Sequence, residues 1–299
     1  MRDPSDSTLQ RLTAVLERIE SLLPQPRSND FTSSVAFRWR KRRFLGFEQG
    51  ELQPVTRPAL IAFDDLKHVD HQKEAVRRNT EQFVCGLPAN NVLLTGARGT
   101  GKSSLIRACL HAFSAQGLRL IEVDKRDLID IADVVDQVAQ RSERFIVFCD
   151  DLSFDANEAG YKELKAALDG SIAGAADNVL IYASSNRRHL MPEMMRDNLG
   201  TRFDEDGEIH PTEAVEERVS LSERFGLWLS FYPFRQDDYL DIVAHWLTRF
   251  GSQRSDIDAA RAEALQFALQ RGSRSGRVAL QFARHWAGSQ RLSGSSDKA

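Results

Sequence analysis

The stretch GARGTGKS, from Gly96 to Ser103, constrains the fold of this chain more than any other feature. The apolar run 92–94 precedes it, and apolar residues at helical spacing follow it from Leu105 to Phe113. The pattern G-x-x-x-x-G-K-[ST] between a strand and a helix is typical of the phosphate-binding P-loop. Its glycines let backbone N–H groups surround a phosphate at the positive end of the helix. We therefore expect a nucleotide site at this junction.

The motif also provides side chains for the phosphates and their metal ion. Lys102 can reach the β and γ phosphates, and the hydroxyl of Ser103 can ligate Mg²⁺. The side chain of Arg98 is expected to extend from the loop into solvent. The predicted nucleotide-binding residues are Gly96, Ala97, Arg98, Gly99, Thr100, Gly101, Lys102, Ser103 and Ser104.

A second apolar strand, 145–149, ends abruptly in the two carboxylates Asp150 and Asp151. In P-loop proteins a strand of this kind delivers an aspartate to the Mg²⁺ shell. Ligands bind at the carboxyl edge of a parallel sheet, and an apolar strand can place a carboxylate there. We predict that Asp150 binds the metal together with Ser103. The alternative is an aspartate in an ordinary turn at the strand end.

Three polar residues lie at the ends of further elements downstream. Asn186 follows the next apolar strand, where it could hold the attacking water or touch the γ phosphate, although asparagine is also common in turns. Arg224 stands just before another apolar strand, and a surface arginine is the alternative interpretation. Arg277 begins a C-terminal helix, and Arg274 is the competing candidate for the same role.

The order of these elements resembles that of the AAA+ ATPases. They match Walker A, Walker B, sensor 1, the arginine finger and sensor 2 of that class, spread over residues 60–290. The stretches HVDHQKEAVRRNTEQF and IYASSNRRHL are similar in particular to a family of uncharacterised bacterial AAA+ ATPases, known only as a domain of unknown function. The resemblance implies ATP and Mg²⁺ as ligands, and an α/β core with a small helical lid.

The resemblance also implies a role for each candidate residue. Asp150 would ligate Mg²⁺ through water, Asp151 would orient the attacking water, and Asn186 would assist that water. Arg277 would contact the γ phosphate from the lid of the same subunit. Arg224 would reach the nucleotide of a neighbouring subunit, and this implies a homo-oligomer with shared sites.

Two details refine the expected site. The segment LKHVDHQKEAV, 66–76, would line the adenine pocket. Many AAA+ motors have glutamate where this chain has Asp151, and the shorter aspartate predicts slow hydrolysis. Helicase loaders and transposition helper ATPases also show the Asp-Asp-Leu step found here at 150–152.

Strand and helix patterns alternate from residue 91 to 232, which predicts an α/β fold with a parallel sheet and helices on both faces. We expect four regions along the chain. They are an N-terminal helix, linker and basic segment in 1–59, an α/β nucleotide-binding core in 60–233, a helical lid in 234–290 and a disordered tail in 291–299.

Two segments outside these motifs have alternative interpretations. The segment FRWRKRRFLGF, 37–47, could grip phosphate backbones or an acidic partner. We favour an exposed strand or helix that Trp39, Phe44 and Phe47 anchor to the core, because runs of charge are often solvated. The charged segment 192–217 could be a functional loop near a subunit interface or pore, or a disordered insertion.

The composition limits the class of protein. A net charge of −3 excludes a basic field over the whole surface. Cys85, Cys109 and Cys149 stand in apolar surroundings, which favours buried thiols in a reducing compartment. His68 and His71 lack a third ligand, so we expect no metal there. No apolar run approaches the roughly 20 residues of a membrane span, and the first ten residues lack a signal-peptide core, so a cytoplasmic protein is expected.

The leading hypothesis is a Mg²⁺-dependent ATPase that couples ATP binding and hydrolysis to conformational change or assembly on a macromolecular client. One alternative is a loader or helper ATPase that acts on nucleic acid, favoured by the Asp-Asp-Leu step and the basic segment. A nucleotide-gated switch with little hydrolysis is another. A small-molecule kinase is disfavoured, because it would not need Asn186, Arg224 and Arg277.

Overall fold

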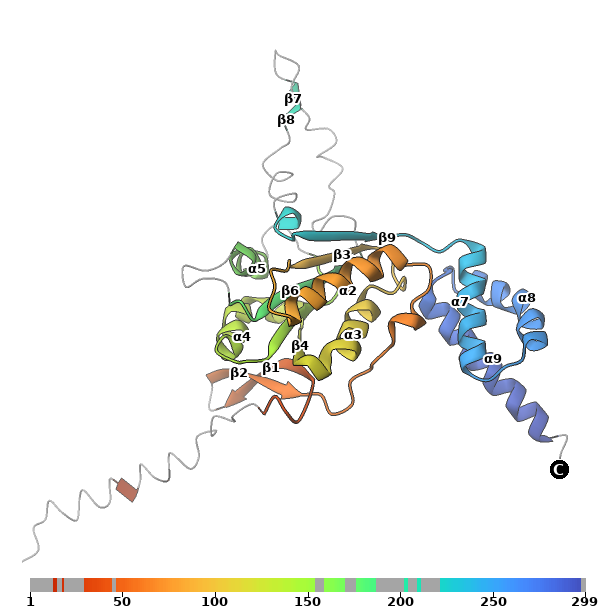
Figure 1. The fold of residues 1–299 in the computed structure, drawn as a ribbon, viewed down its shortest axis with the longest axis horizontal. Coiled ribbons are helices and arrows are strands. Elements are labelled where there is room, and N and C mark those ends of the chain that lie inside the picture. Colours follow the sequence, from red (N-terminus) through yellow and green to blue (C-terminus); the bar gives the residue numbers. More distant parts are fainter. Residues whose placement is uncertain are drawn as a thin grey trace, which may run out of the picture.

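The computed structural model describes residues 13–14, 18, 30–44, 47–153, 159–169, 176–186, 202–203, 209–210 and 221–296. A sheet flanked by helices forms the main body, and three C-terminal helices lie together at one end of it (Figure 1). The N-terminal helix expected within 1–59 falls largely outside the described residues, because only 13–14 and 18 are described before residue 30. So does most of the charged segment 192–217, of which β7 (Arg202–Phe203) and β8 (Ile209–His210) form an antiparallel pair.

Seven strands form one sheet in the order β2-β1-β4-β5-β6-β3-β9. Their bounds are β1 (Ala36–Phe44), β2 (Phe47–Pro54), β3 (Val92–Gly96), β4 (Leu118–Val123), β5 (Arg144–Cys149), β6 (Val179–Ser185) and β9 (Leu227–Phe231). β1 and β2 pair antiparallel, whereas the other neighbours pair parallel. Strands β3, β5 and β6 are almost fully buried, as apolar strands covered on both faces should be.

Helices cover both faces of this sheet, and each face has its own hydrophobic core. The flanking helices are α2 (Asp70–Val84), α3 (Lys102–Phe113), α4 (Ile131–Val138) and α5 (Ala159–Asp169). Alternate strand residues point to opposite faces. Leu94 and Phe148 therefore pack with α2 and α3, whereas Leu93 and Val147 pack with α4 and α5. The predicted α/β sheet with helices on both faces is confirmed. Short 3-10 turns link these elements at η1 (Phe63–Asp65), η2 (Ser114–Gln116) and η3 (Lys125–Asp130).

The three C-terminal helices pack together, and we refer to them as the lid. They are α7 (Gln236–Arg249), α8 (Arg254–Gln270) and α9 (Gly276–Ser296). Leu240, Val243 and Phe282 of the lid belong to the same hydrophobic cluster as the α2 and α3 face of the sheet. Phe231 and Phe234, where the chain leaves β9, are buried in that cluster and join the two parts. Body and lid thus share one core.

The C-terminal end differs from the expected disordered tail, because α9 continues through residues 291–296. The guanidinium of Arg291 donates a hydrogen bond to the carbonyl oxygen of Phe250, just after α7 ends. This contact fastens the last turns of α9 to the rest of the lid.

The basic segment forms β1, which pairs with β4 inside the main sheet. The sheet therefore begins before residue 60, where we expected the core to start. Trp39 is buried, and its indole N–H donates to Asp130 Oδ2 at 3.0 Å. An exposed strand anchored by Trp39 was the favoured interpretation, and Trp39 fits it. The side chains of Phe44 and Phe47 lie outside the described residues.

Most of the positive charge on β1 is neutralised within the chain. The ion pairs are Arg38–Glu122 at 2.7 Å, Lys41–Asp130 at 2.8 Å, Arg42–Glu51 at 2.5 Å and Arg43–Glu48 at 3.0 Å. A surface that binds a phosphate backbone needs cations free to displace its counterions. This strand is therefore a poor candidate for a nucleic-acid surface.

The cysteines agree only partly with the expectation of buried thiols. Cys109 and Cys149 are buried, and burial raises the pKa of each thiol to about 12. Cys85 is exposed, because it caps the surface end of α2. Across the part of the chain that the structure describes, none of the helices combines the length and the apolar composition that a membrane span requires.

Candidate nucleotide-binding site

The loop 96–101 connects the end of β3 to the start of α3 and is packed closely on both sides. Gly96 and Gly99 have φ angles of 122° and 74°, a region that residues with side chains disfavour. A Cβ on Gly96 would lie 1.9 Å from the carbonyl oxygen of Phe231, and one on Gly99 would lie 2.8 Å from Ser275 Oγ. The loop thus touches β9 on one side and the residue before α9 on the other.

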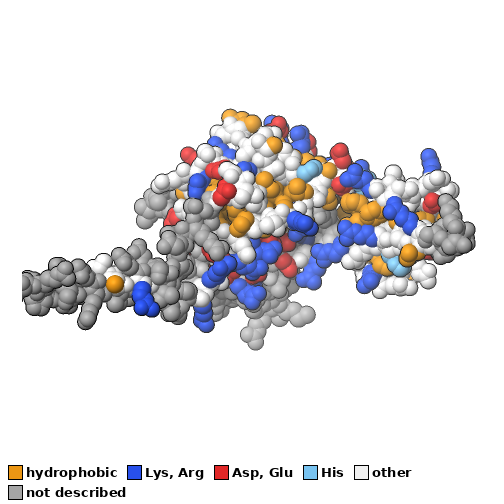
Figure 2. Space-filling model, turned by 90° about the horizontal axis from the view of Figure 1, so that it is seen from below, with side chains coloured by type: hydrophobic (Ala, Val, Ile, Leu, Met, Phe, Trp, Pro, Cys, Tyr) orange, Lys and Arg blue, Asp and Glu red, His pale blue; other side chains and the backbone are white. Residues whose placement is uncertain are grey.

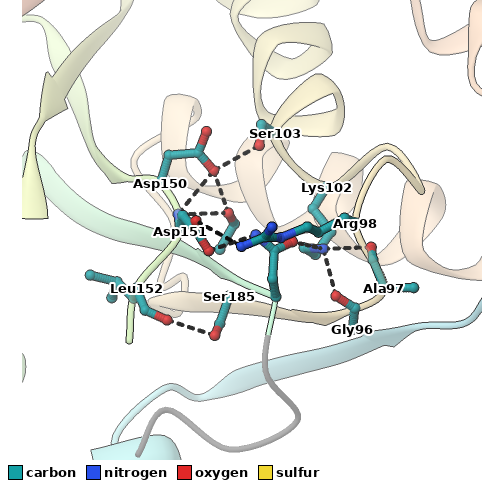
Figure 3. Close-up of polar contacts among 11 residues, drawn as sticks. Gly96, Ala97, Arg98, Lys102, Ser103, Asp150, Asp151, Leu152 and Ser185 are labelled. Atoms are coloured by element: carbon teal, nitrogen blue, oxygen red, sulfur yellow. Dashed lines mark hydrogen bonds and ion pairs between the residues drawn. The ribbon is translucent and has the colours of Figure 1, made fainter. Parts of the chain in front are cut away.

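Lys102, the first residue of α3, turns back toward this loop (Figure 3). Its Nζ donates to the carbonyl oxygens of Gly96 and Ala97 at 2.7 and 2.8 Å, and to Asn186 Oδ1 at 3.0 Å. Burial lowers the pKa of Lys102 to about 8, although the nearby carboxylates oppose this shift. A buried ammonium group at a helix N-terminus is well suited to bind a phosphate.

Asp150 lies directly after β5, and its Oδ1 accepts three hydrogen bonds. The hydroxyls of Ser103 and Ser184 donate at 2.8 and 2.5 Å, and the backbone N–H of Asp151 donates at 3.1 Å. Ser103 and Asp150 therefore come together from two different elements. Their hydroxyl and carboxylate oxygens suit a hard cation such as Mg²⁺. No motif identifies Ser184, although the small polar residues that end β6 are a signal for it.

Asp151 has a left-handed backbone, with φ 54°, which is uncommon for a residue with a side chain. Strain of this kind is concentrated at functional sites. The amide of Asn186 donates to Asp151 Oδ1 at 2.6 Å, so that Asn186 bridges Asp151 and Lys102. Arg98 is 77% exposed, but its Nη2 lies 3.9 Å from Asp151 Oδ2. Its guanidinium is therefore turned toward the site rather than away from it (Figure 3).

These residues line one cavity of about 560 Å³. Its polar end is lined by Arg98, Lys102, Ser103, Asp150, Asp151 and Asn186. Its apolar residues are Ile61, Leu66, Val69, Phe234, Ile242, Trp246 and Leu280. The lining also includes the basic residues Lys67, Arg107 and Arg277, which leaves an excess of positive charge over the carboxylates. Figure 2 shows one face of the molecule, on which Lys and Arg side chains lie over the body, over the lid and where the two meet. An apolar end and a cationic end suit a nucleotide.

The structure separates the two candidate arginines of the lid. Arg277, in the first turn of α9, lines the cavity described above, whereas Arg274 lines a separate cavity of about 730 Å³ behind the P-loop. Of the segment 66–76, the cavity is lined by Leu66, Lys67 and Val69, and from Asp70 onward the chain forms α2.

The buried carboxylate of Asp65, which also lines this cavity, contacts two side chains of the lid. Asp65 is 8% exposed and lies between the body and α7. His245 Nε2 approaches its Oδ1 at 3.0 Å, and Arg249 Nε lies 3.3 Å from the same oxygen. No sequence motif identified this cluster, because its members are far apart in the chain.

His68 makes a second contact with the lid. It has a left-handed backbone, with φ 60°. Its Nδ1 lies 3.3 Å from Asp238 Oδ1, and its Nε2 lies 3.4 Å from Asp241 Oδ2, both on α7. Among the described residues, no cluster of His, Cys, Asp and Glu side chains could hold a metal ion by itself. His68 thus has a structural contact with the lid.

Arg224 lies apart from the cavity of its own chain. Its Nε donates to Asp169 Oδ1, at the end of α5, at 2.6 Å. It precedes β9, at the amino end of a strand that runs parallel to β3, whereas the P-loop follows the carboxyl end of β3. The structure therefore brings together the other predicted site residues but not Arg224.

The solved structures that are similar to this chain include those of the following three proteins. Aeropyrum pernix ORC1 in complex with DNA has a TM-score of 0.51 and 15% identity, over 80% of this chain and 63% of that one. The Thermotoga maritima RuvB Holliday junction branch migration motor has a TM-score of 0.47 and 16% identity, over 76% and 64%. The Trip13-containing HORMA:CdnC:Trip13 complex of E. coli MS115-1 gives 0.46 and 14%, over 74% and 89%. This chain thus spans less than two thirds of the RuvB and ORC1 chains, and the likeness concerns the fold.

A comparison of the sequence with curated proteins gives no match. A family model described as "Protein of unknown function (DUF815)" matches residues 32–290. The match confirms the narrower resemblance noted from the sequence, and ORC1 supports the AAA+ fold. The chain belongs to the DUF815 family, whose member here has the α/β P-loop fold of the AAA+ ATPases.

Proposed function

We propose that this protein is a Mg²⁺-dependent ATPase that couples the nucleotide state to a change of conformation or assembly on a macromolecular client. The observation that carries the proposal is the chain of contacts across one cavity. Lys102 binds Asn186 at 3.0 Å, and Asn186 binds Asp151 at 2.6 Å. The Ser103–Asp150 pair lies beside it, at 2.8 Å. P-loop ATPases need these groups for phosphate binding, water activation and metal binding.

Each group would act on a different part of the triphosphate. Lys102 would bind the β and γ phosphates, and Ser103 and Asp150 would hold Mg²⁺, which would offset the charge of those phosphates. Asp151, held by Asn186, would orient the attacking water and accept its proton. Arg277 would contact the γ phosphate from the lid, because it lines the same cavity. The apolar residues beside the lid would bind the base.

Arg224 is the reason to propose an oligomer. It does not line the cavity of its own chain. It lies near the amino ends of the parallel strands, whereas the P-loop follows the carboxyl end of β3. An arginine supplied by a neighbouring subunit would stabilise the charge that develops in the transition state. In this scheme, Arg224 would exchange its contact with Asp169 for the γ phosphate bound by the adjacent chain.

The experiment is the ATPase rate per subunit over a wide range of protein concentration, for wild type, Asp151→Asn and Arg224→Ala. We expect the rate to rise with concentration and to fall at least about a hundredfold in both variants. Binding of ATP should persist in both variants, because neither residue binds the β phosphate. A concentration-independent rate that survives both substitutions would contradict the shared site.

A nucleotide-gated switch with little hydrolysis is the second candidate. It is favoured by the contacts of Asp151, whose carboxylate accepts a hydrogen bond from Asn186 at 2.6 Å and lies 3.9 Å from Arg98. A near-zero rate at every concentration, combined with tight ATP binding, would select this function. A nucleic-acid client has less support, because ion pairs neutralise most of the basic side chains on β1. DNA is present in the ORC1 structure, so single-stranded DNA is still the first client to test for stimulation.

A further inference from the structure

We propose that Arg98 binds the γ phosphate from within the P-loop and thereby distinguishes ATP from ADP. The inference rests on the proposed nucleotide site and adds a cation that the motif does not specify. The letter x in G-x-x-x-x-G-K-[ST] leaves this position open, so a P-loop does not require arginine there. The reason for assigning it a role lies in the direction of its side chain.

The guanidinium of Arg98 spans the polar end of the cavity. It starts in the loop between β3 and α3, and its Nη2 lies 3.9 Å from Asp151 Oδ2, beyond the end of β5. Lys102, Asn186 and Asp151 are joined by hydrogen bonds of 3.0 and 2.6 Å. Arg98 completes this series from the other side, at the carboxylate that would face the γ phosphate. A terminal phosphate bound by Lys102 and Asn186 would lie within reach of Arg98.

Exposure and charge both suit this role. The Arg98 side chain is 77% exposed, and its ion pair with Asp151 is long, at 3.9 Å. Little would be lost if the guanidinium left Asp151 for a phosphate. Arginine presents a planar fork of N–H donors that matches phosphate oxygens, and such charged hydrogen bonds are stronger than neutral ones. Binding to the γ phosphate would also release one oxygen of Asp151 for the attacking water.

The first test compares the dissociation constants of ADP and of a non-hydrolysable ATP analogue, with Mg²⁺ present, for wild type and Arg98→Ala. We expect the analogue to bind roughly ten- to a hundredfold more weakly to the variant, and ADP to bind almost unchanged. Arg98→Lys should recover part of the loss, because it keeps the charge but not the fork. Equal losses for both nucleotides, or no loss, would overturn the proposal.

Arg274→Ala is the matched control. Arg274 lines the cavity behind the P-loop, which Arg98 also borders, but it does not line the nucleotide cavity, so the substitution removes one positive charge close to the site but outside it. It should leave the ratio of the two dissociation constants within about twofold of wild type. If Arg274→Ala reproduces the selective loss, the effect of Arg98 is a general electrostatic one and the assignment is wrong.

Asp151 provides a second, independent measurement. Asp151→Asn should strengthen binding of the ATP analogue, because Arg98 no longer divides its contacts between a carboxylate and a phosphate. In an Arg98→Ala background most of this gain should disappear. A gain of the same size in both backgrounds would reflect simple repulsion between Asp151 and the phosphate, and would contradict the exchange.

The variant Lys102→Ala separates this proposal from the proposed function. Lys102 should be required for binding of both nucleotides. If Lys102→Ala abolishes both while Arg98→Ala changes neither, the nucleotide site stands and only the role of Arg98 falls. If the wild-type protein binds neither nucleotide, the proposed function falls and the role of Arg98 falls with it.

Discussion

Lys102 is a buried cation whose three hydrogen-bond acceptors are neutral oxygens of Gly96, Ala97 and Asn186. Desolvation is therefore the largest effect on its pKa, and it lowers the value from 10.5 to about 8. An anion bound beside Nζ would favour the charged form and raise the pKa again. Burial of the Lys102 ammonium group thus lowers the stability of the protein without nucleotide, and it favours binding of a phosphate beside Nζ.

The desolvation of Lys102 predicts that the stability of the protein depends on pH. Between pH 8 and 10.5 the folded chain binds fewer protons at Lys102 than the unfolded chain, so this group makes stability rise with pH. Lys102→Met lacks that slope. Its free energy of unfolding relative to that of wild type should therefore be about 2–3 kcal/mol larger at pH 7 than above pH 10, so that the variant gains stability at pH 7. Urea denaturation of both proteins, without nucleotide, measures the difference, and parallel stability curves would contradict the shift.

At the scale of elements, β1 and β2 form an antiparallel hairpin, in which the side chain of Trp39 on β1 packs over β2. Gly50 lies on β2 beneath this ring, and a Cβ there would come within 1.9 Å of the indole. The indole cannot move freely, because it is buried and its N–H is bound to Asp130. The hairpin is thus fixed to η3 by a large side chain that tolerates only glycine opposite it.

Gly50→Ala should therefore destabilise the protein by about 1–3 kcal/mol through overpacking. Gln49→Ala, on the same strand, has an exposed side chain and serves as the control, with an expected change within about 0.5 kcal/mol. Chemical denaturation midpoints at equal m-values give the comparison. Equal midpoints for the two variants would mean that the ring shifts and leaves room for a methyl group.

The elements differ in how far their sequences reveal them. Strands buried on both faces are continuous apolar runs, which makes them easy to locate. The strand expected at 145–149 begins only one residue earlier in the structure. β1 was expected outside the core. Its charges are balanced by residues distant in sequence, such as Glu122 for Arg38, and no local pattern contains that information.

The same distinction applies to the site. The P-loop and the two aspartates after β5 could be found because each motif is local. Asp65 could not, because a single aspartate acquires its role only from partners brought by the fold. The direction of the Arg98 side chain cannot be read from the sequence for a similar reason, because its neighbour Asp151 comes from the segment after β5.

At the scale of the whole molecule, the cavity lies where the body meets the lid. Its lining includes Leu66 and Lys102 from the body, and Trp246 and Arg277 from the lid. A ligand that touches both parts would therefore alter how firmly they are held together. The polar contacts beside the cavity, at Asp65 and at His68, would contribute to the same linkage.

His68 allows this linkage to be tested without a change in the cavity lining, to which His68 does not contribute. Asparagine tolerates the left-handed backbone at this position but is too short to reach both Asp238 and Asp241. His68→Asn should weaken ATP binding about two- to fivefold, as expected for the loss of partly exposed polar contacts. Amide hydrogen exchange in α7 should become faster. His71→Asn, an exposed histidine one turn away, is the matched control and should behave as wild type. Unchanged affinity and unchanged exchange in His68→Asn would mean that the shared hydrophobic core alone sets the position of the lid.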